Sequence, residues 1–156
     1  MRYICAILLM FIPTLASAKY RILPPTYHTV ELKKLNKRVV QFLPTVKRAA
    51  KKYDIPHSVL LAIIWKESNF RVKVLGASGE IGPTQIKPAW AKHFGFPAKA
   101  LWDMSTNIDT CARILRGHYN RYRSMRAALH AYNGLTPRGA IYAMDVIQRA
   151  EVIRAQ

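Results

Sequence analysis

The sequence holds only eight aspartate and glutamate residues, and Glu67 is the one whose setting suggests chemistry. It follows the apolar run Val59 to Trp65 and stands at the C-terminal end of the helix that this run predicts. Apolar surroundings and the negative end of the helix dipole both disfavour the charged form, so we expect a raised pKa. A carboxyl that is protonated near neutral pH can protonate a glycosidic oxygen. A Glu67 that faces water or pairs with Arg71 is the open alternative, and it would stay ionised.

Four short blocks stand in order along the chain, and Glu67 opens the first. They are Glu67-Ser68-Asn69-Phe70, Gly79-Glu80-Ile81-Gly82-Pro83-Thr84-Gln85-Ile86-Lys87-Pro88, Asn107-Ile108 and Ala131-Tyr132-Asn133-Gly134. Together they resemble the SLT-type (family 1) lytic transglycosylases, which are goose-type-lysozyme-like enzymes of bacterial peptidoglycan. The resemblance covers roughly Leu43 to Ile147. The small size suggests the single-domain periplasmic forms associated with secretion or conjugation systems.

The resemblance implies roles for the matching residues. Glu67 is expected to be the only catalytic acid and base, with the hydroxyl of Tyr132 close to it. Four residues are expected to bind the substrate: Ser68, Gln85, Tyr132 and Asn133. The sequence departs from the family where Pro83-Thr84 replaces a frequent Leu-Met pair, so the apolar wall of that subsite is expected to differ.

The reaction implied by the resemblance needs no metal and no cofactor. Glu67 protonates the oxygen between N-acetylmuramic acid (MurNAc) and N-acetylglucosamine (GlcNAc). It then takes the proton from the muramyl 6-hydroxyl, which closes onto C1 and leaves a 1,6-anhydroMurNAc end. A hydrolytic lysozyme-like muramidase is the alternative, and it would place a second carboxylate about 5–5.5 or 6.5–9.5 Å from the first. Glu80 is the one acid considered for that role, although an ion pair or a loop cap is the commoner use of such a carboxylate.

The formal net charge of +17 predicts a polyanionic partner, because 25 lysine and arginine residues face only eight acids. Nucleic acid, an acidic membrane surface and an anionic polymer all fit this charge. Export removes most of the case for nucleic acid, so we expect peptidoglycan glycan strands as the partner. A non-catalytic, basic, helical envelope-binding module is the alternative from another class, but it leaves Glu67, Gln85 and Tyr132 without a purpose. The five scattered histidines lack ligand spacing and predict no metal site.

The N-terminal residues have the pattern of an export signal. Arg2 precedes the apolar run Ile4 to Leu15, and Ala16-Ser17-Ala18 suits a signal peptidase. An uncleaved anchor is the competing interpretation, which the shortness of the run disfavours. We expect a signal peptide over residues 1–18, an extended leader over 19–30 and one lysozyme-like transglycosylase domain over 31–156. The mature protein is expected to be a periplasmic monomer without stable membrane insertion.

Helical spacing of apolar residues, without long alternating runs, predicts an all-α fold with a long, buried central helix and a Gly-rich active-site loop. A first helix should be kinked or split at Pro44, and the central helix should start at Pro56 with its cap at Asp54 or Ile55. The Gly-rich loop should cover Arg71 to Thr84. Further helices are expected over Pro88 to His93, from a cap at Ser105 or Thr106 through Tyr122, over Ser124 to Tyr132, and from Thr136-Pro137 through Met144 and Ile147.

Some residues that look reactive have simpler interpretations. Cys111 stands among apolar residues at helical spacing, so we expect a buried small hydrophobe rather than a nucleophile. Four aromatic residues could stack on sugars, although their spacing suits core positions better: Trp90, Trp102, Tyr119 and Tyr122.

Overall fold

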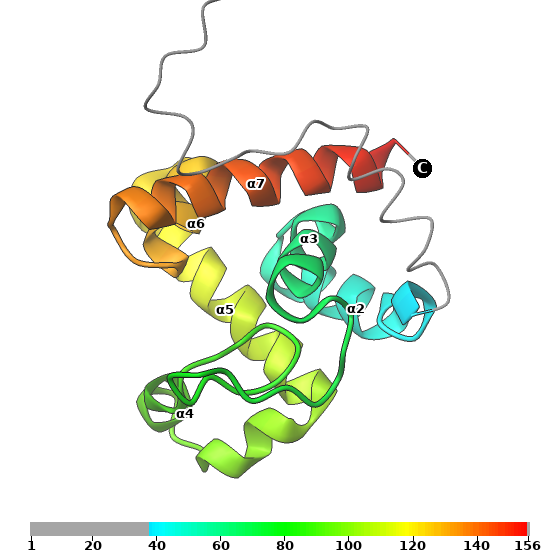
Figure 1. The fold of residues 1–156 in the computed structure, drawn as a ribbon, viewed down its shortest axis with the longest axis vertical. Helices are drawn as coiled ribbons and strands as arrows, with labels where there is room; N and C mark the ends of the chain where they lie inside the picture. Colours follow the sequence, from blue (N-terminus) through cyan, green and yellow to red (C-terminus); the bar gives the residue numbers. More distant parts are fainter. Residues whose placement is uncertain (1–37, 156) are drawn as a thin grey trace, which may run out of the picture.

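A computed structural model describes residues 38–155 of the chain, which form helices joined by loops (Figure 1). This range contains no β-strand, only isolated bridges that pair Ile81 with Leu75 and with Ile86. The helices are α2 (Leu43–Tyr53), α3 (His57–Ser68), α4 (Pro88–His93), η2 (Ala98–Trp102), α5 (Met104–Tyr122), α6 (Met125–Tyr132) and α7 (Pro137–Arg154). The all-α prediction is confirmed. The expected signal peptide and leader lie outside the described residues.

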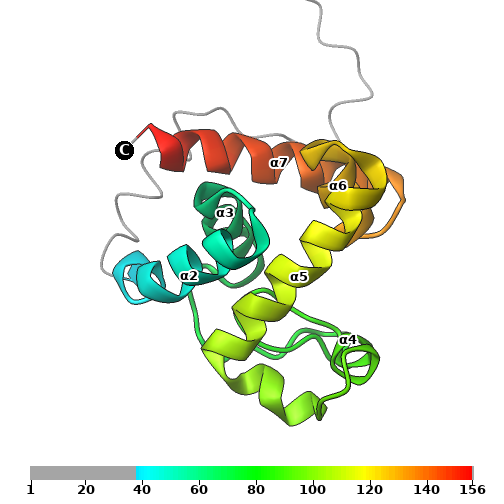
Figure 2. The same cartoon turned by 180° about the vertical axis from the view of Figure 1, so that it is seen from behind.

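Helix α3 lies at the centre of the fold, as its apolar sequence predicts. It packs against α7, α2 and α5, and Figure 2 shows these three helices around it from behind. Leu60, Ile63 and Ile64 are completely buried, because this helix has no polar face to turn toward water. The burial of such side chains, about 1.5–3 kcal/mol each, is what fixes α3 among its neighbours. No helix within residues 38–155 is long and apolar enough to cross a membrane.

Proline sets where the first two helices begin. Residues 38–40 are helical, 41–42 form a turn, and α2 starts again at Leu43 with Pro44 in its first turn. The predicted split at Pro44 is therefore confirmed, since proline lacks the backbone donor that a continuous helix would need. Pro56 is the cap of α3 rather than its first residue, and Asp54 instead ends α2 with a left-handed φ of 49°. The predicted cap at Asp54 or Ile55 is wrong by one or two residues.

The later helices begin at side-chain caps. Asp103 caps α5, because its Oδ1 accepts a hydrogen bond of 2.7 Å from the backbone N–H of Thr106. The predicted cap at Ser105 or Thr106 is therefore wrong, because the carboxylate before them already satisfies the free donor. Thr136 caps α7 as predicted, accepting from the N–H of Gly139 at 3.2 Å. This last helix runs on past Ile147 to Arg154.

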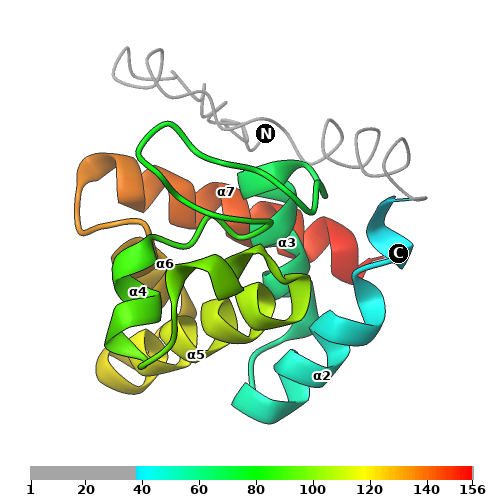
Figure 3. The same cartoon turned by 90° about the horizontal axis from the view of Figure 1, so that it is seen from below.

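The longest connection in the described part of the chain joins α3 to α4, and Figure 3 shows it in green. It contains the Gly-rich segment predicted over Arg71 to Thr84. Two of its glycines, Gly79 and Gly82, have φ values of 83° and 79°, which residues with a side chain rarely adopt. The loop leaves α3 directly after Glu67 and Ser68, so it carries the chain past the end of the central helix.

Candidate active site

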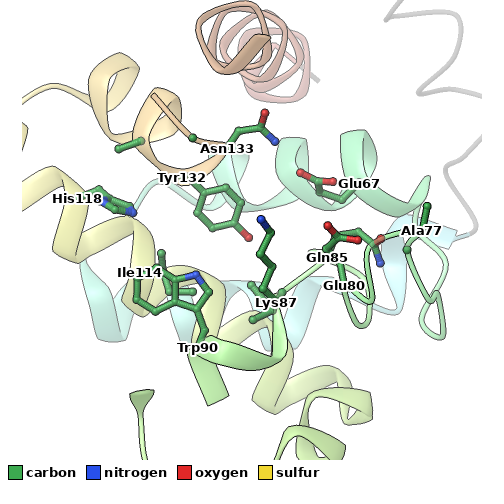
Figure 4. A pocket seen from close by; sticks show the side chains of 14 residues that line it. Glu67, Ala77, Glu80, Gln85, Lys87, Trp90, Ile114, His118, Tyr132 and Asn133 are labelled. Carbon is green, nitrogen blue, oxygen red and sulfur yellow. The ribbon is translucent and has the colours of Figure 1, made fainter. Parts of the chain in front are cut away.

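A cavity of about 540 Å³ opens beside the C-terminal end of α3 (Figure 4). Its lining comes from α3, the loop that joins α3 to α4, α4, α5, the end of α6 and the α6–α7 connection, so sequence blocks that lie far apart meet here. Four of the five residues predicted for the site line it: Glu67, Gln85, Tyr132 and Asn133.

Glu67 enters the cavity from the last turn of α3. The helix stops two residues later, where Asn69 adopts a left-handed φ of 53° and its N–H closes onto the carbonyl of Trp65. The Glu67 side chain is partly buried, and this removal from water raises its pKa from 4.5 to about 7. Interactions with Tyr142 and Lys66 lower the pKa, and the charge of Glu80 raises it. The effect of burial is the largest of these, so the carboxyl stays protonated up to near-neutral pH.

Arg71 does not form the ion pair with Glu67 that the sequence left as an alternative. The Nε of Arg71 donates instead to the backbone carbonyl of Ser68 at 2.9 Å. The adjacent Lys66 also has another partner, because its Nζ lies 2.7 Å from a carboxylate oxygen of Asp145 on α7. Asp145 is buried and is shared with Arg149 at 3.3 Å, which ties Lys66 to α7. The Asp145 carboxylate therefore partly neutralises the positive charge of Lys66, the residue directly before Glu67.

Tyr142 on α7 supplies a second hydroxyl next to Glu67. Its side chain is buried, and it interacts with the Glu67 carboxyl in the direction that favours ionisation. Within residues 38–155 its hydroxyl has no hydrogen bond of standard geometry, so the interaction with Glu67 is a loose one. Its ring stacks on that of Tyr132, with centroids 6.4 Å apart and planes 17° apart. Burial raises the pKa of both tyrosines well above the usual value, so both hydroxyls remain neutral donors.

Tyr132 and Asn133 end α6 at the opposite wall. The Tyr132 hydroxyl donates to the backbone carbonyl of Thr84 at 2.9 Å, which fastens the end of α6 to the Gly-rich loop. Asn133 caps the helix through its backbone N–H, and its exposed side chain stays available to the cavity. Figure 4 shows Tyr132 and Glu67 reaching the cavity from different elements.

Gln85 is held in place by its own loop. Its backbone has a φ of 50°, and its Nε2 donates to the carbonyls of Gly82 at 2.9 Å and Val74 at 3.3 Å. The amide nitrogen is therefore occupied, and the amide oxygen lies against Gly76, where any side chain would collide with it. A side chain at position 76 would therefore push the Gln85 amide out of this position.

Asn107 on α5 anchors the same loop from beneath. It is completely buried and satisfies all its hydrogen-bonding groups with backbone and Thr84. Its Nδ2 donates to the carbonyls of Ile81 and Leu101 at 2.8 and 3.0 Å. Its Oδ1 accepts from the backbone N–H and the hydroxyl of Thr84 at 3.0 and 2.6 Å. A side chain on Gly82 would collide with the Asn107 amide. Asn107, from the third sequence block, therefore packs directly against the Gly-rich loop of the second block and holds it in place.

Comparison with known proteins identifies the family. The family model of the transglycosylase SLT domain matches residues 44–139, which is more than half of the chain. The chain belongs to the SLT transglycosylase family. It is also 32% identical, over 117 residues, to the membrane-bound lytic murein transglycosylase C of Serratia proteamaculans (strain 568). That match covers 64% of this chain but 33% of the relative, so the chain spans about a third of the length of that protein.

The SLT domain model covers the elements that build the cavity up to the start of α7. The lysozyme-like, all-helical fold expected from the sequence blocks is thereby confirmed. Tyr142 and Asp145 lie beyond the matched residues, on the face of α7 that packs against α3.

Ser68 is the predicted site residue that the structure keeps out of the cavity. Its side chain is buried, and its hydroxyl donates to the carbonyl of Ile64 one turn earlier in α3. A serine hydroxyl in a helix commonly bonds back in this way. The hydroxyl of Ser68 is thus engaged within the helix that carries Glu67, and the substrate-binding role expected for this residue stays a prediction.

Glu80 shares the cavity with Glu67. One of its carboxylate oxygens accepts from the backbone N–H of Ser78 at 3.1 Å, which braces the turn. The negative charge of Glu80 also raises the pKa of Glu67, so the two carboxyls interact across the cavity. The loop-cap interpretation and a contribution to the site both have support, and they do not exclude each other.

Several cavity residues were not in the predicted set. Trp90, Lys87 and His118 line the cavity. Tyr142 on α7 is not among the lining residues, but it interacts with the Glu67 carboxyl. The sequence favours a core position for Trp90 over a sugar-stacking one; in the structure it is partly buried, lines the cavity and meets His118 edge-on. Lys87 follows Gln85 in the second block, which was the only sequence signal that it stands near the site.

The structure gives no other group within residues 38–155 an obvious catalytic setting. No cluster of three or more histidine, cysteine, aspartate or glutamate side chains in this range is arranged to hold a metal ion. Cys111 is completely buried, and burial raises the pKa of its thiol to about 12. The prediction of a buried small hydrophobe at this position is confirmed.

Proposed function

We propose that this protein is a lytic transglycosylase that cleaves the MurNAc-β-1,4-GlcNAc bond of peptidoglycan without water. The observation that carries the proposal is the Glu67 carboxyl, whose pKa of about 7 keeps it protonated up to near-neutral pH, in a cavity that Gln85 and Tyr132 also line. Membership of the SLT transglycosylase family and similarity to a lytic murein transglycosylase support it. A non-catalytic binding module would have no use for a protonated buried carboxyl.

The proposed reaction uses Glu67 twice. The carboxyl donates its proton to the glycosidic oxygen, the bond from that oxygen to C1 of MurNAc breaks, and positive charge develops on the muramyl ring. The carboxylate then removes the proton from the muramyl 6-hydroxyl, whose oxygen bonds to C1. The product ends in 1,6-anhydroMurNAc, and Glu67 is protonated again. A pKa of about 7 suits both steps, because neither protonation state is strongly disfavoured.

A hydrolytic muramidase is the second candidate, favoured by the presence of Glu80 in the same cavity. In that reaction a second carboxylate would activate a water or stabilise the charged sugar. The single-carboxylate reaction is the better supported, because Glu80 already accepts from the Ser78 N–H in the loop. No cofactor enters either reaction.

Digestion of purified sacculi separates these functions. The native protein is expected to release muropeptides lighter by one water than hydrolytic products, as measured by mass spectrometry. The Glu67→Gln protein should release none under the same conditions. Release of only hydrolytic masses would support the muramidase, and equal binding of sacculi by both proteins without any release would support the non-catalytic module.

The cellular setting is part of the proposal. Residues 1–18 are proposed to direct export, so that a monomeric domain works on glycan strands in the periplasm, without nucleic acid as a partner and without stable membrane insertion. A secretion or conjugation apparatus that needs a local opening in the wall is the proposed context. Fusion of residues 1–18 to a periplasm-dependent reporter tests the export step, and an inactive fusion would contradict it.

A further inference from the structure

Three buried side chains of α7 face the turn of α3 that carries Glu67. They are Tyr142, Asp145 and Arg149, and their spacing of three and four residues places them on one face of the helix. We call these three residues the α7 stripe. Helix α7 packs against α3, as Figure 1 shows. Asp145 and Arg149 lie beyond the residues that the SLT domain model matches.

The α7 stripe contacts three consecutive residues of α3, in reverse order along the chain. The pairs are Arg149 with Trp65, Asp145 with Lys66, and Tyr142 with Glu67. The Arg149 guanidinium lies over the Trp65 ring at 4.4 Å. A carboxylate oxygen of Asp145 lies 2.7 Å from the Nζ of Lys66. Consecutive helical residues point about 100° apart, so these contacts hold the turn from several directions and restrain both sliding and rotation.

Asp145 is the centre of these contacts. Its side chain binds two cations, because the Nε of Arg149 lies 3.3 Å from each carboxylate oxygen in addition to the contact with Lys66. Burial opposes the ionisation of Asp145, but the hydrogen bond from Lys66 and the charge of Arg149 outweigh it and lower the pKa. Asp145 is therefore ionised at neutral pH, and it directs the flexible Lys66 side chain to α7.

The charge of Lys66 matters because this residue directly precedes Glu67. A positive charge at this position favours the ionised form of the Glu67 carboxyl, which cannot donate a proton. The titratable groups of the described residues that act on Glu67 or feel its charge are Lys66 of α3, Glu80 of the loop, Cys111 of α5, Tyr132 of α6 and Tyr142 of α7. Lys66 is the cation in this set, and Asp145 is the anion that pairs with it.

We propose that Asp145 is a positioning residue for the proton donor and acts through Lys66. Its carboxylate holds the Lys66 ammonium, which fixes the turn that presents Glu67 to the cavity, and it cancels part of the positive charge beside that carboxyl. Neither Asp145 nor Lys66 lines the cavity, so neither is expected to touch the substrate. The inference rests on the proposed function, because it concerns the acid that this function requires.

Substitution of Lys66 tests the positioning. Lys66→Met removes the link to α7 and leaves Asp145 with Arg149, so the variant should fold. On solubilised glycan strands at pH 5, where Glu67 is protonated, its kcat should fall about tenfold with little change in KM, because the turn that carries the acid is no longer held. Rates are normalised to the folded fraction, measured by circular dichroism, so that a loss of stability does not imitate this result.

The matched control is Lys52→Met. It breaks another lysine–aspartate pair between two helices, that of Lys52 in α2 with Asp109 in α5 at 2.9 Å. Neither of these residues lines the cavity, so the control should keep the native kcat. A native kcat for Lys66→Met, or equal losses in Lys66→Met and Lys52→Met, would overturn the proposal.

Asp145→Asn tests the effect of charge. Without the carboxylate, the Lys66 ammonium favours ionisation of Glu67 more strongly, so the alkaline limb of the kcat/KM profile should move to lower pH, by less than about one unit. Lys66→Met should move the limb to higher pH, because the cation is gone. Asp145→Asn added to Lys66→Met should move the limb no further, since Asp145 acts through Lys66.

Two results of the charge test would overturn the proposal. One is an unmoved limb in Asp145→Asn, and the other is a full shift when Asp145→Asn is added to Lys66→Met. Asp145→Asn also takes the carboxylate from the buried Arg149, which lowers stability. Where that variant does not fold, the kcat and the limb of Lys66→Met decide the proposal.

An NMR titration of the Glu67 carboxyl separates this inference from the proposed function, because it needs no substrate. The midpoint should lie below the native value in Asp145→Asn and above it in Lys66→Met. These shifts, together with a native protein that cleaves no glycan, would remove the proposed function and keep the control of Glu67 by Asp145. Cleavage by the native protein together with unmoved midpoints would keep the function and remove the inference.

Discussion

The cavity around Glu67 and the exposed surface around Arg113 on α5 are built in opposite ways. In the cavity, polar groups are positioned by buried bonds, such as those that Asn107 makes with the loop. On the exposed surface, the guanidinium of Arg113 lies over the Phe94 ring at 4.0 Å. The cavity therefore has a shifted pKa and a loop fixed by buried bonds, whereas the surface has a charge that water can reach.

This difference bears on catalysis. Proton transfer requires a carboxyl whose pKa is shifted by burial and whose position is fixed to a fraction of an ångström. An exposed charge contributes little to such a transfer, because water screens it. Substitutions in the cavity should therefore change rates by orders of magnitude, and those on the exposed surface around Arg113 by small factors.

Glu67→Gln should have the largest effect. The amide has nearly the same shape but carries no transferable acidic proton, so kcat/KM on sacculi should fall by about 10³-fold or more. A matched control is Glu151→Gln, an exposed acid near the end of α7. Retention of more than a tenth of the native rate by Glu67→Gln would break the contrast between the cavity and the exposed surface, because the chemistry would then lie elsewhere.

Asn107→Ala should be the next most damaging change. It leaves two carbonyls and the N–H and hydroxyl of Thr84 without partners in the interior. We expect a loss of about 2–4 kcal/mol in the free energy of unfolding, measured by denaturant titration, and reduced activity of the remaining folded protein. Asn120→Ala, an exposed change on the same helix, should cost less than about 0.5 kcal/mol. Equal losses from the two variants would show that the buried anchor is unimportant.

Glu80→Gln should have a moderate effect with a diagnostic direction. Because the Glu80 charge raises the pKa of Glu67, its removal should move the alkaline limb of the kcat/KM profile to lower pH. The rate at pH 5 should fall less than about tenfold, since general acid catalysis by Glu67 remains. A loss as complete as that of Glu67→Gln would favour the two-carboxylate, hydrolytic reaction.

Tyr142→Phe should have the smallest effect and the opposite sign. The Tyr142 hydroxyl lowers the pKa of Glu67, so its loss should move the alkaline limb to higher pH, by less than about one unit. Thermal stability should hardly change, because this buried hydroxyl has no hydrogen bond of standard geometry within residues 38–155. A shift in the same direction as Glu80→Gln would contradict the roles given to both residues.

Much of this arrangement could be predicted from local sequence. The all-round apolar character of α3 predicts a central helix, and a glutamate at its end predicts a carboxyl pressed against the core. The order of the four blocks then brings Gln85, Tyr132 and Asn133 to the same place. These predictions depend on periodicity and on motif residues, both of which are readable along the chain.

The rest depended on contacts between distant elements. Tyr142 lies 75 positions after Glu67, and a tyrosine on a buried helix face looks like any core aromatic. The family resemblance predicts Ser68 at the site, but one residue along a helix is a turn of about 100°, and the Ser68 hydroxyl donates to the carbonyl of Ile64 instead. The α5 cap was misplaced because three cap-forming residues, Asp103, Ser105 and Thr106, stand close together.

The most direct test is an NMR titration of the Glu67 side-chain carboxyl in ¹³C-labelled protein, with the Glu67→Gln protein used to assign the signal. The structure predicts a midpoint at about pH 7, because burial outweighs the interactions with Tyr142 and Lys66. A midpoint near 4.5, the ordinary value for glutamate, would mean that the carboxyl is ionised at neutral pH and would contradict its role as the proton donor.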